Sequence, residues 1–280
     1  MSFIAACVQS TATPDINADI RVLTGFIREA GARGARFIAT PEYCAGLDTR
    51  DGKMFPVAFT EAEHPVLPAM QGLARELGAW LLIGSIGVRA PDGRIFNRSF
   101  MITPSGAIAA RYDKIHLFDI DLGEGRVYHE SATIAAGHKA VIAPCAEGMI
   151  GLSICYDIRF PHLYRAYAQE GAELLAAPAA FTRVTGEAHW HVLQRARAIE
   201  NGAYVISPAQ CGTLSGGAEC YGHSLIVDPW GRVLADGGSE PGIVTAEIDL
   251  AQVAETRRRI PSLQHDKPYA AACLATSKAS

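Results

Sequence analysis

One cysteine stands where a thiol could be made reactive. Cys155 ends an apolar run that starts at Gly151, and a polar turn then leads to Pro161 and a helical pattern beginning at His162. We therefore expect Cys155 on a tight strand-to-helix corner, near the N-terminal end of a helix. Exposure at such a corner and the helix dipole both favour a thiolate, the nucleophilic form of cysteine. Buried, inert cysteines are also common, so the pattern alone does not identify a nucleophile.

Three other ionisable residues follow predicted strands, where α/β proteins commonly place functional side chains. They are Glu42 after a run ending Thr-Pro, Lys114 after a run ending Tyr-Asp, and Glu130 in a Tyr-His-Glu-Ser stretch. A cysteine nucleophile needs a base to take its proton and a donor to stabilise the oxyanion formed on attack. Glu and Lys can supply both. Each residue also has a structural interpretation, because Glu42 could cap a turn and the other two could be solvated surface charges.

Three motifs resemble those of the nitrilase (carbon–nitrogen hydrolase) superfamily. They are Pro41-Glu42, the run from Tyr112 to Asp119 around Lys114, and the run from Gly151 to Pro161 around Cys155, and they occur in the family's order. The resemblance extends from about Ile4 to about Tyr269. It implies that Cys155 is the nucleophile, that Glu42 is the general base, and that Lys114 stabilises the tetrahedral intermediate.

The resemblance implies further residues of the site. The family often has a second active-site glutamate after the lysine. Glu130 is the expected residue, and Glu124 is the alternative because the intervening loop varies in length among relatives. The backbone N–H of Tyr156 is expected to complete the oxyanion hole with Lys114. The loop that begins at Phe181-Thr182 is expected to lie beside the acyl group of the substrate.

Several later stretches are similar to the branch that contains deaminated-glutathione amidases and omega-amidases. They are residues 185–190, 193–201, 208–212, 221–224 and 227–231, and residues 209–212 and 259–265 favour the deaminated-glutathione amidases. The implied substrate is a small linear amide that bears a carboxylate, cleaved through a Cys155 thioester to an acid and ammonia or an amine. No metal or organic cofactor is expected. His191 stands where those relatives commonly carry Glu, which leaves the substrate open.

Alternatives remain within and outside this reaction. Alpha-keto acid amides and N-carbamoyl amines are the other substrate classes. Nitriles are disfavoured, because the sequence Cys155-Tyr156-Asp157 differs from the Cys-Trp-Glu of nitrile-cleaving members. A catalytically silent binding protein is disfavoured by the intact Glu42, Lys114 and Cys155. An acyltransferase, in which another amine or hydroxyl captures the thioester, stays open because the acceptor depends on the shape of the pocket.

Strand-like and helix-like segments alternate along most of the chain. Helices are expected at 16–32, 64–77, 163–170, 187–201 and 250–259, and strands at 3–9, 36–39, 79–88, 95–103, 107–112, 149–154, 174–177, 203–207, 223–228, 233–236 and 243–248. Turn sequences predict hairpins between 79–88 and 95–103 and between 223–228 and 233–236. The mixture predicts an α/β sandwich whose helices cover buried sheets. The resemblance implies a four-layer α-β-β-α sandwich, as a single domain over 1–272 with a frayed tail over 273–280.

Composition narrows the partners and the compartment. The 280-residue chain has a net charge of −4 and a pI near 6.1, so neither nucleic acid nor a membrane surface is expected as a partner. Its seven cysteines form no C-x-x-C pair, and reduced thiols in a cytoplasmic protein are the simplest interpretation. The resemblance implies a homodimer packed through helices, or a larger homo-oligomer.

Two side-chain pairs have structural interpretations. His189 and His191 are two apart on a predicted helix and should point in different directions, which makes them a poor metal pair. Asp157 and Arg159 are expected to form an ion pair that fixes the corner around Cys155.

Overall fold

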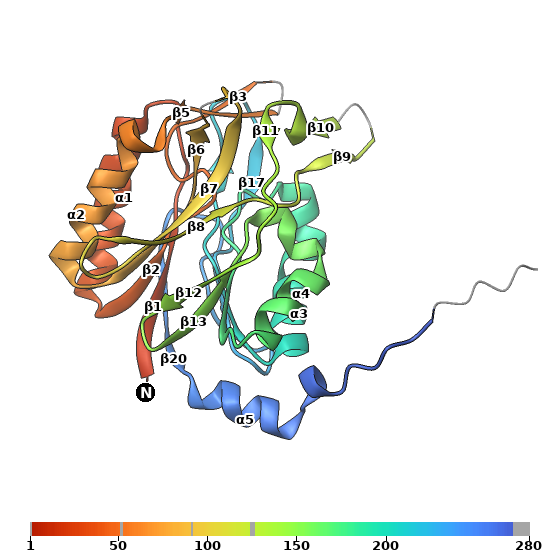
Figure 1. Cartoon of the computed structure of the whole chain (residues 1–280). Coiled ribbons are helices and arrows are strands. Elements are labelled where there is room, and N and C mark those ends of the chain that lie inside the picture. Colours follow the sequence, from red (N-terminus) through yellow and green to blue (C-terminus); the bar gives the residue numbers. More distant parts are fainter. Residues whose placement is uncertain (1, 51–52, 91, 124–126, 271–280) are drawn as a thin grey trace, which may run out of the picture.

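The computed structural model describes residues 2–50, 53–90, 92–123 and 127–270. Two β-sheets pack face to face, and helices cover the outer side of each (Figure 1). This arrangement confirms the predicted α-β-β-α sandwich. The tail predicted over 273–280 and the domain boundary at 272 lie outside the described residues.

The first sheet is built mainly from the first half of the chain, with strand order β11-β7-β6-β2-β1-β20 and with β5 and β8 paired to β6 and β7. Its strands are β1 (Ser2–Gln9), β2 (Ala35–Ala39), β5 (Ala58–Phe59), β6 (Trp80–Arg89), β7 (Ile95–Ile102), β8 (Ile108–Asp113), β11 (Ile134–Ala135) and β20 (Gly242–Asp249). The antiparallel β6–β7 pair confirms the first predicted hairpin.

The second sheet has the strand order β12-β13-β14-β15-β18-β19. Its strands are β12 (Val141–Cys145), β13 (Gly148–Leu152), β14 (Leu174–Ala176), β15 (Tyr204–Ser207), β18 (Leu225–Val227) and β19 (Val233–Asp236). The β18–β19 pair confirms the second predicted hairpin. Strand β12 was not predicted. It is an edge strand that contains Pro144, a residue that edge strands tolerate because it lacks an N–H.

Two helices cover each sheet, and a fifth follows β20. They are α1 (Ile16–Ala32) and α2 (Val66–Leu77) on the first sheet, α3 (Pro161–Gln169) and α4 (Arg183–Asn201) on the second, and α5 (Ala251–Arg259). The prediction for α1 is confirmed at both ends. The Asp15 carboxylate caps its first turn by accepting the N–H groups of Asn17 and Ala18. No described helix has the length and apolar character needed to cross a membrane.

Helix α4 begins four residues before its predicted start. Gly186 lies inside the helix, and the ring of Tyr221 packs directly against it. A Cβ at this position would lie 2.3 Å from Cγ of Tyr221. The glycine is therefore required by close packing inside the helix rather than by a turn.

Three short hairpins were not predicted. They are β3 (Leu47–Arg50) with β4 (Lys53–Pro56), β9 (Asp119–Asp121) with β10 (Val127–His129), and β16 (Cys211–Thr213) with β17 (Glu219–Tyr221). Strands of three or four residues carry too little periodicity to be recognised in sequence. They matter for function because β4 and β10 supply residues to the cavity described below.

Apolar side chains from the facing sheets form one continuous core. It includes Phe37, Leu82 and Met101 of the first sheet and Leu152 and Ile206 of the second. A separate cluster fills the space between the first sheet and helices α1 and α2. Strand β2, which precedes Glu42, contributes Phe37 to the first cluster and Ile38 to the second and is thus packed on both faces.

Candidate active site

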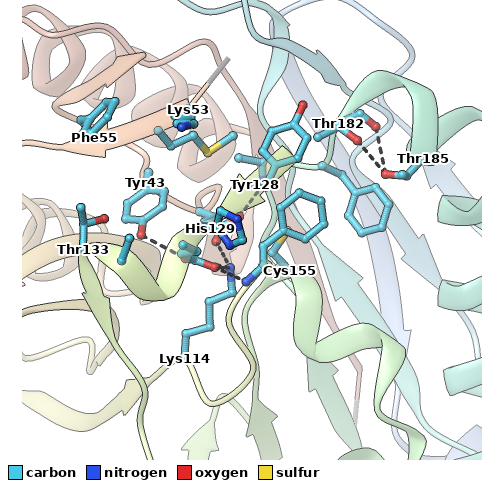
Figure 2. A pocket seen from close by; sticks show the side chains of 17 residues that line it. Tyr43, Lys53, Phe55, Lys114, Tyr128, His129, Thr133, Cys155, Thr182 and Thr185 are labelled. Atoms are coloured by element: carbon cyan, nitrogen blue, oxygen red, sulfur yellow. Dashed lines mark hydrogen bonds and ion pairs between the residues drawn. The ribbon is translucent and has the colours of Figure 1, made fainter. Parts of the chain in front are cut away.

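A cavity of about 340 Å³ brings together the four ionisable residues singled out from the sequence. Glu42, Lys114, Glu130 and Cys155 all line it, although the chain separates them widely. Lys53 and Tyr43 lie on one side of the cavity, and Thr182 and Thr185 lie on the other (Figure 2). The cavity is large enough for a small organic molecule.

Cys155 lies on a sharp corner after β13. The chain leaves that strand at Leu152 and enters a single 3₁₀ turn, Cys155–Arg159, before α3 begins. The φ angle of Cys155 is +48°, a left-handed conformation that costs a non-glycine residue about 1–3 kcal/mol. Its N–H donates to the carbonyl of Pro178 at 2.8 Å, which helps to hold this conformation. The corner itself was predicted.

The expected exposure of the thiol is wrong, and Cys155 lies at the start of the 3₁₀ turn rather than at the start of α3. Cys155 is only 7% exposed, and α3 does not begin until Pro161. Burial raises the pKa of the Cys155 thiol well above its ordinary value, and the neighbouring carboxylate of Glu42 raises it further, against the opposing effect of Lys114. At neutral pH the thiol is therefore protonated, and it needs a base at the moment of attack.

Glu42 is placed as such a base would have to be. It follows β2 and is 2% exposed. Its Oε1 accepts from Nζ of Lys114 at 2.9 Å and from Nδ2 of Asn97 at 2.8 Å, and its Oε2 accepts from the N–H of Ala180 at 2.8 Å. These donors fix the carboxylate beside Cys155 and prevent it from turning away.

Lys114 bridges two carboxylates. Besides Glu42, its Nζ donates to Oε1 and Oε2 of Glu130 at 3.1 and 2.9 Å. Burial favours the neutral amine, but Glu130 and Glu42 outweigh it and raise the pKa of Lys114 well above its ordinary value. The side chain is therefore a fixed ammonium group that is almost fully buried. Such a group stabilises negative charge strongly.

Glu130 is held by backbone as well as by side chains. Its Oε2 accepts the N–H of Phe118 at 2.7 Å, and its Oε1 accepts from the hydroxyl of Tyr43 at 3.3 Å. Glu124, the alternative to Glu130, lies outside the described residues. The structure thus supplies one carboxylate at the second position, in contact with Lys114.

Asn97 is a site residue that the sequence interpretation missed. It is fully buried on β7, and its Nδ2 donates to Glu42 at 2.8 Å and to Oε1 of Glu130 at 3.3 Å. The sequence does contain one feature that could have identified it. Asn97 and Ser99 are polar residues on the buried face of a strand whose other inward positions are apolar. A buried amide needs polar partners, which predicts a polar site without saying which one.

The expected ion pair between Asp157 and Arg159 is wrong. The buried carboxylate of Asp157 instead accepts from the hydroxyl of Tyr112 at 2.6 Å and from the N–H groups of His116 and Ile154 at 3.0 and 2.9 Å. Nδ1 of His116 lies 2.7 Å from the same carboxylate. Tyr112 and His116 flank Lys114 in sequence, so Asp157 ties the lysine segment to the cysteine corner.

Three other predicted residues lie at the site in different ways. Phe181 and Thr182 line the cavity, and the hydroxyl of Thr182 contacts that of Thr185 at 2.8 Å. Tyr156 is not among the lining residues, and its ring packs against Phe118 and Phe160. The role expected of Tyr156 was for its backbone N–H and stays a prediction.

The two histidines of α4 have separate partners. Nδ1 of His189 contacts the guanidinium of Arg159 at 3.2 Å, whereas Nε2 of His191 contacts Asp236 at 3.0 Å. Neither histidine lines the cavity.

Comparisons with known proteins agree with this geometry. The carbon-nitrogen hydrolase family profile matches residues 4–258. The chain is similar to a deaminated glutathione amidase of Synechocystis sp., with 40% identity over 94% of this chain and 97% of the relative. It is also similar to the human omega-amidase NIT2, with 36% identity over 93% of each chain.

A solved structure agrees in fold. The C. elegans NitFhit protein superposes with a TM-score of 0.86 and 32% identity over 95% of this chain. That match covers 65% of the NitFhit chain, so this chain spans about two-thirds of that protein's length. The family match and the identities across nearly the whole sequence show that this chain belongs to the carbon–nitrogen hydrolase family of the nitrilase superfamily and is an amide-hydrolysing enzyme.

Proposed function

We propose that this enzyme hydrolyses a small linear amide that bears a carboxylate, of the deaminated-glutathione kind, through a thioester on Cys155. The observation that carries the proposal is the buried arrangement of three residues in one cavity. Cys155 lies there beside Glu42, and Oε1 of Glu42 is 2.9 Å from Nζ of Lys114. A nucleophile, a base and a cation are thus held together out of bulk water.

The acylation step uses Glu42 as the base. As sulfur attacks the amide carbon, a C–S bond forms, Glu42 takes the thiol proton, and the carbonyl π electrons move to oxygen. The raised pKa of Cys155 supports this coupled proton transfer over a preformed thiolate. When the intermediate collapses, the C–N bond breaks and the proton on Glu42 leaves with the nitrogen as ammonia or an amine.

Lys114 and a backbone N–H stabilise the oxyanion in this scheme. The ammonium of Lys114 supplies a fixed positive charge, and the N–H of Tyr156 supplies a second donor next to the nucleophile. Glu130 holds Lys114 in place through its contacts at 3.1 and 2.9 Å. We assign Glu130 a positioning role, because its other oxygen contacts are with Phe118, Tyr43 and Asn97.

In deacylation Glu42 carries a proton from water to Cys155. The water molecule gives this proton to Glu42 as the oxygen of the water attacks the thioester carbon. The C–S bond then breaks, and the proton on Glu42 returns to Cys155. No electrons are gained or lost, so the cycle needs no redox partner.

The far end of the cavity fits a carboxylate. Lys53 contributes a cationic side chain to the wall at a distance from Cys155, and the imidazole of His129 lies between them (Figure 2). Phe181 and Thr182 line the acyl path from the opposite wall. The similar proteins named above, a deaminated glutathione amidase and an omega-amidase, support an acid-amide substrate. An omega-amidase acting on alpha-keto acid amides is the second candidate, on the strength of the latter name.

An amide panel tests this proposal. Ammonia release would be measured from glutaramate, which has a carboxylate, and from butyramide, which lacks one. We expect Cys155→Ala to abolish release from both. Lys53→Met should lower kcat/KM for glutaramate about tenfold, the loss of one charge-assisted hydrogen bond, and spare butyramide. Lys139→Met, at an exposed lysine outside the cavity, is the matched control. Lack of turnover with every amide, or equal effects on both substrates, would contradict the proposal.

We also propose a homodimer packed through helices. Val184, Val192 and Ile199 are 52%, 66% and 51% exposed and share one face of α4, since they are eight and seven residues apart. An exposed apolar stripe of this kind is typical of an interface. Sedimentation as a monomer at micromolar concentration would contradict it. A cytoplasmic location is proposed from the cysteines, because the six in the described part of the chain are all free thiols.

A further inference from the structure

We propose that His191, His223 and Asp236 form a binding site for a divalent transition metal, with Zn²⁺ as the best fit. Nε2 of His191 is 3.0 Å from Oδ2 of Asp236, and Nδ1 of His223 is 2.8 Å from Oδ1. Within the described residues this is the only group of at least three histidine, cysteine or acidic side chains whose ligating atoms all lie within 4.8 Å of one another. None of the three lines the active-site cavity.

The distances suit a zinc ion after small side-chain rotations. Tetrahedral zinc with bonds of about 2.0–2.1 Å to nitrogen and oxygen separates its ligand atoms by about 3.3 Å. The two contacts between the histidine nitrogens and Asp236 are slightly shorter than this separation. Without an ion the nitrogens and the carboxylate form hydrogen bonds, and a bound ion would replace these bonds and move the atoms slightly apart. Two imidazoles with one carboxylate favour zinc or a similar transition metal over Mg²⁺ and Ca²⁺, which prefer oxygen ligands.

The backbone holds His223 ready for this role. Its φ angle is +54°, a conformation that persists when the surroundings impose it. Its N–H donates to Gly238 at 2.6 Å, and its carbonyl accepts from Nε1 of Trp190 at 2.7 Å. Its ring stacks on Tyr221 with 4.4 Å between ring centroids. These contacts direct the ring toward Asp236 before any metal binds.

Asp236 and His191 are also supported. Oδ1 of Asp236 accepts the N–H of Gly238 at 2.9 Å, which orients the carboxylate. Their side chains are 35% and 33% exposed, so an ion can reach them and water can complete its coordination. From the sequence a metal site was disfavoured, because His191 was considered only together with His189, two residues away on the same helix. The structure instead joins His191 on α4 to the segment after β17 and to the end of β19.

Zinc titration tests the site. Calorimetry would be done on full-length protein carrying Cys155→Ala, so that the active-site thiol cannot bind the ion. We expect one equivalent of Zn²⁺ and a rise in Tm of about 5 °C at a hundredfold excess over Kd. His191→Ala and His223→Asn, each added to this background, should weaken binding at least about 100-fold, more than the loss of an outer-shell partner. Asn is chosen at residue 223 because it tolerates positive φ.

His189→Ala is the matched control, because His189 lies on the same helix but contacts Arg159 instead. It should bind zinc like the background protein. A crystal soaked in Zn²⁺ should show an anomalous peak between His191, His223 and Asp236. Lack of saturable binding, equal affinity in all variants, or equal weakening by His189→Ala would overturn the proposal.

Discussion

Replacing Asp157 with Asn should lower both the stability of the protein and its kcat. The carboxylate accepts the N–H groups of His116 and Ile154 on different oxygens. An amide offers only one oxygen, so one buried backbone N–H must face the NH₂ group. Leaving such a group unsatisfied costs about 1–3 kcal/mol. A central value of about 2 kcal/mol lowers Tm by about 3–4 °C in a chain of this size.

The catalytic loss follows from the segments that Asp157 joins. Relaxation around the new amide shifts Cys155 relative to Lys114, and a displacement of about 1 Å between reacting groups can cost about 100-fold in rate. We expect kcat to fall about 10- to 100-fold with little change in KM. Steady-state ammonia release at a temperature well below the lowered Tm measures this effect.

Asp228→Asn is the control for simple destabilisation. Asp228 is also fully buried: its Oδ1 accepts the N–H groups of Trp230 at 2.9 Å and Arg232 at 2.8 Å, and its Oδ2 accepts from Nε of Arg232 at 2.6 Å. An amide here keeps the two backbone contacts but turns its NH₂ group toward the guanidinium of Arg232, which destabilises the turn. It lies in the β18–β19 turn and does not line the cavity. The variant should lower Tm and leave kcat unchanged. The reasoning is refuted if Asp157→Asn keeps wild-type kcat, or if Asp228→Asn loses as much.

Two further predictions concern other buried polar residues. Asn97→Ala removes hydrogen bonds to Glu42 and Glu130 and should lower kcat about tenfold or more, given about 1.5 kcal/mol for a bond to a charged group. Ser99→Ala, on the same strand but bonded only to the carbonyl of Ile83, should keep kcat, and equal losses would count against the idea. Burial lowers the pKa of His64 to about 4, below its ordinary 6.5. The folded protein therefore binds this proton more weakly than the unfolded chain does, so the free energy of unfolding is highest above pH 6.5 and declines as pH falls toward 4. Urea unfolding at pH 7 and 5 should show a loss of about 2 kcal/mol in the wild type that is absent in His64→Gln, and parallel losses would refute it.

The sequence predicted the elements whose signals are local. Helix α1 has a capping aspartate and a clear apolar face, and both long hairpins have strong turn residues. The start of α4 was placed four residues too late, and the missed residues include Gly186, which packs against Tyr221, a residue far along the chain. The short strands β4 and β10 were missed because they are too short to show a period.

The same distinction between local and long-range signals applies to the site. Glu42, Lys114 and Cys155 stand in recognisable motifs, so their presence could be predicted, and the structure brings them to one cavity. The contacts of Asp157 and Asn97 could not, because their partners come from strands that meet only after folding. The prediction of an exposed Cys155 thiol was wrong for a related reason. Its burial depends on the whole fold and outweighs the local helix that the sequence emphasised.

The central claim is that the acyl group of the substrate passes through Cys155. The most direct test is to mix enzyme with glutaramate, quench in acid within milliseconds, and locate adducts by peptide mass spectrometry. The account predicts an acyl adduct on the peptide that contains Cys155, which hydroxylamine removes and which Cys155→Ala lacks. An adduct at another residue, or full-rate ammonia release by Cys155→Ala, would contradict it.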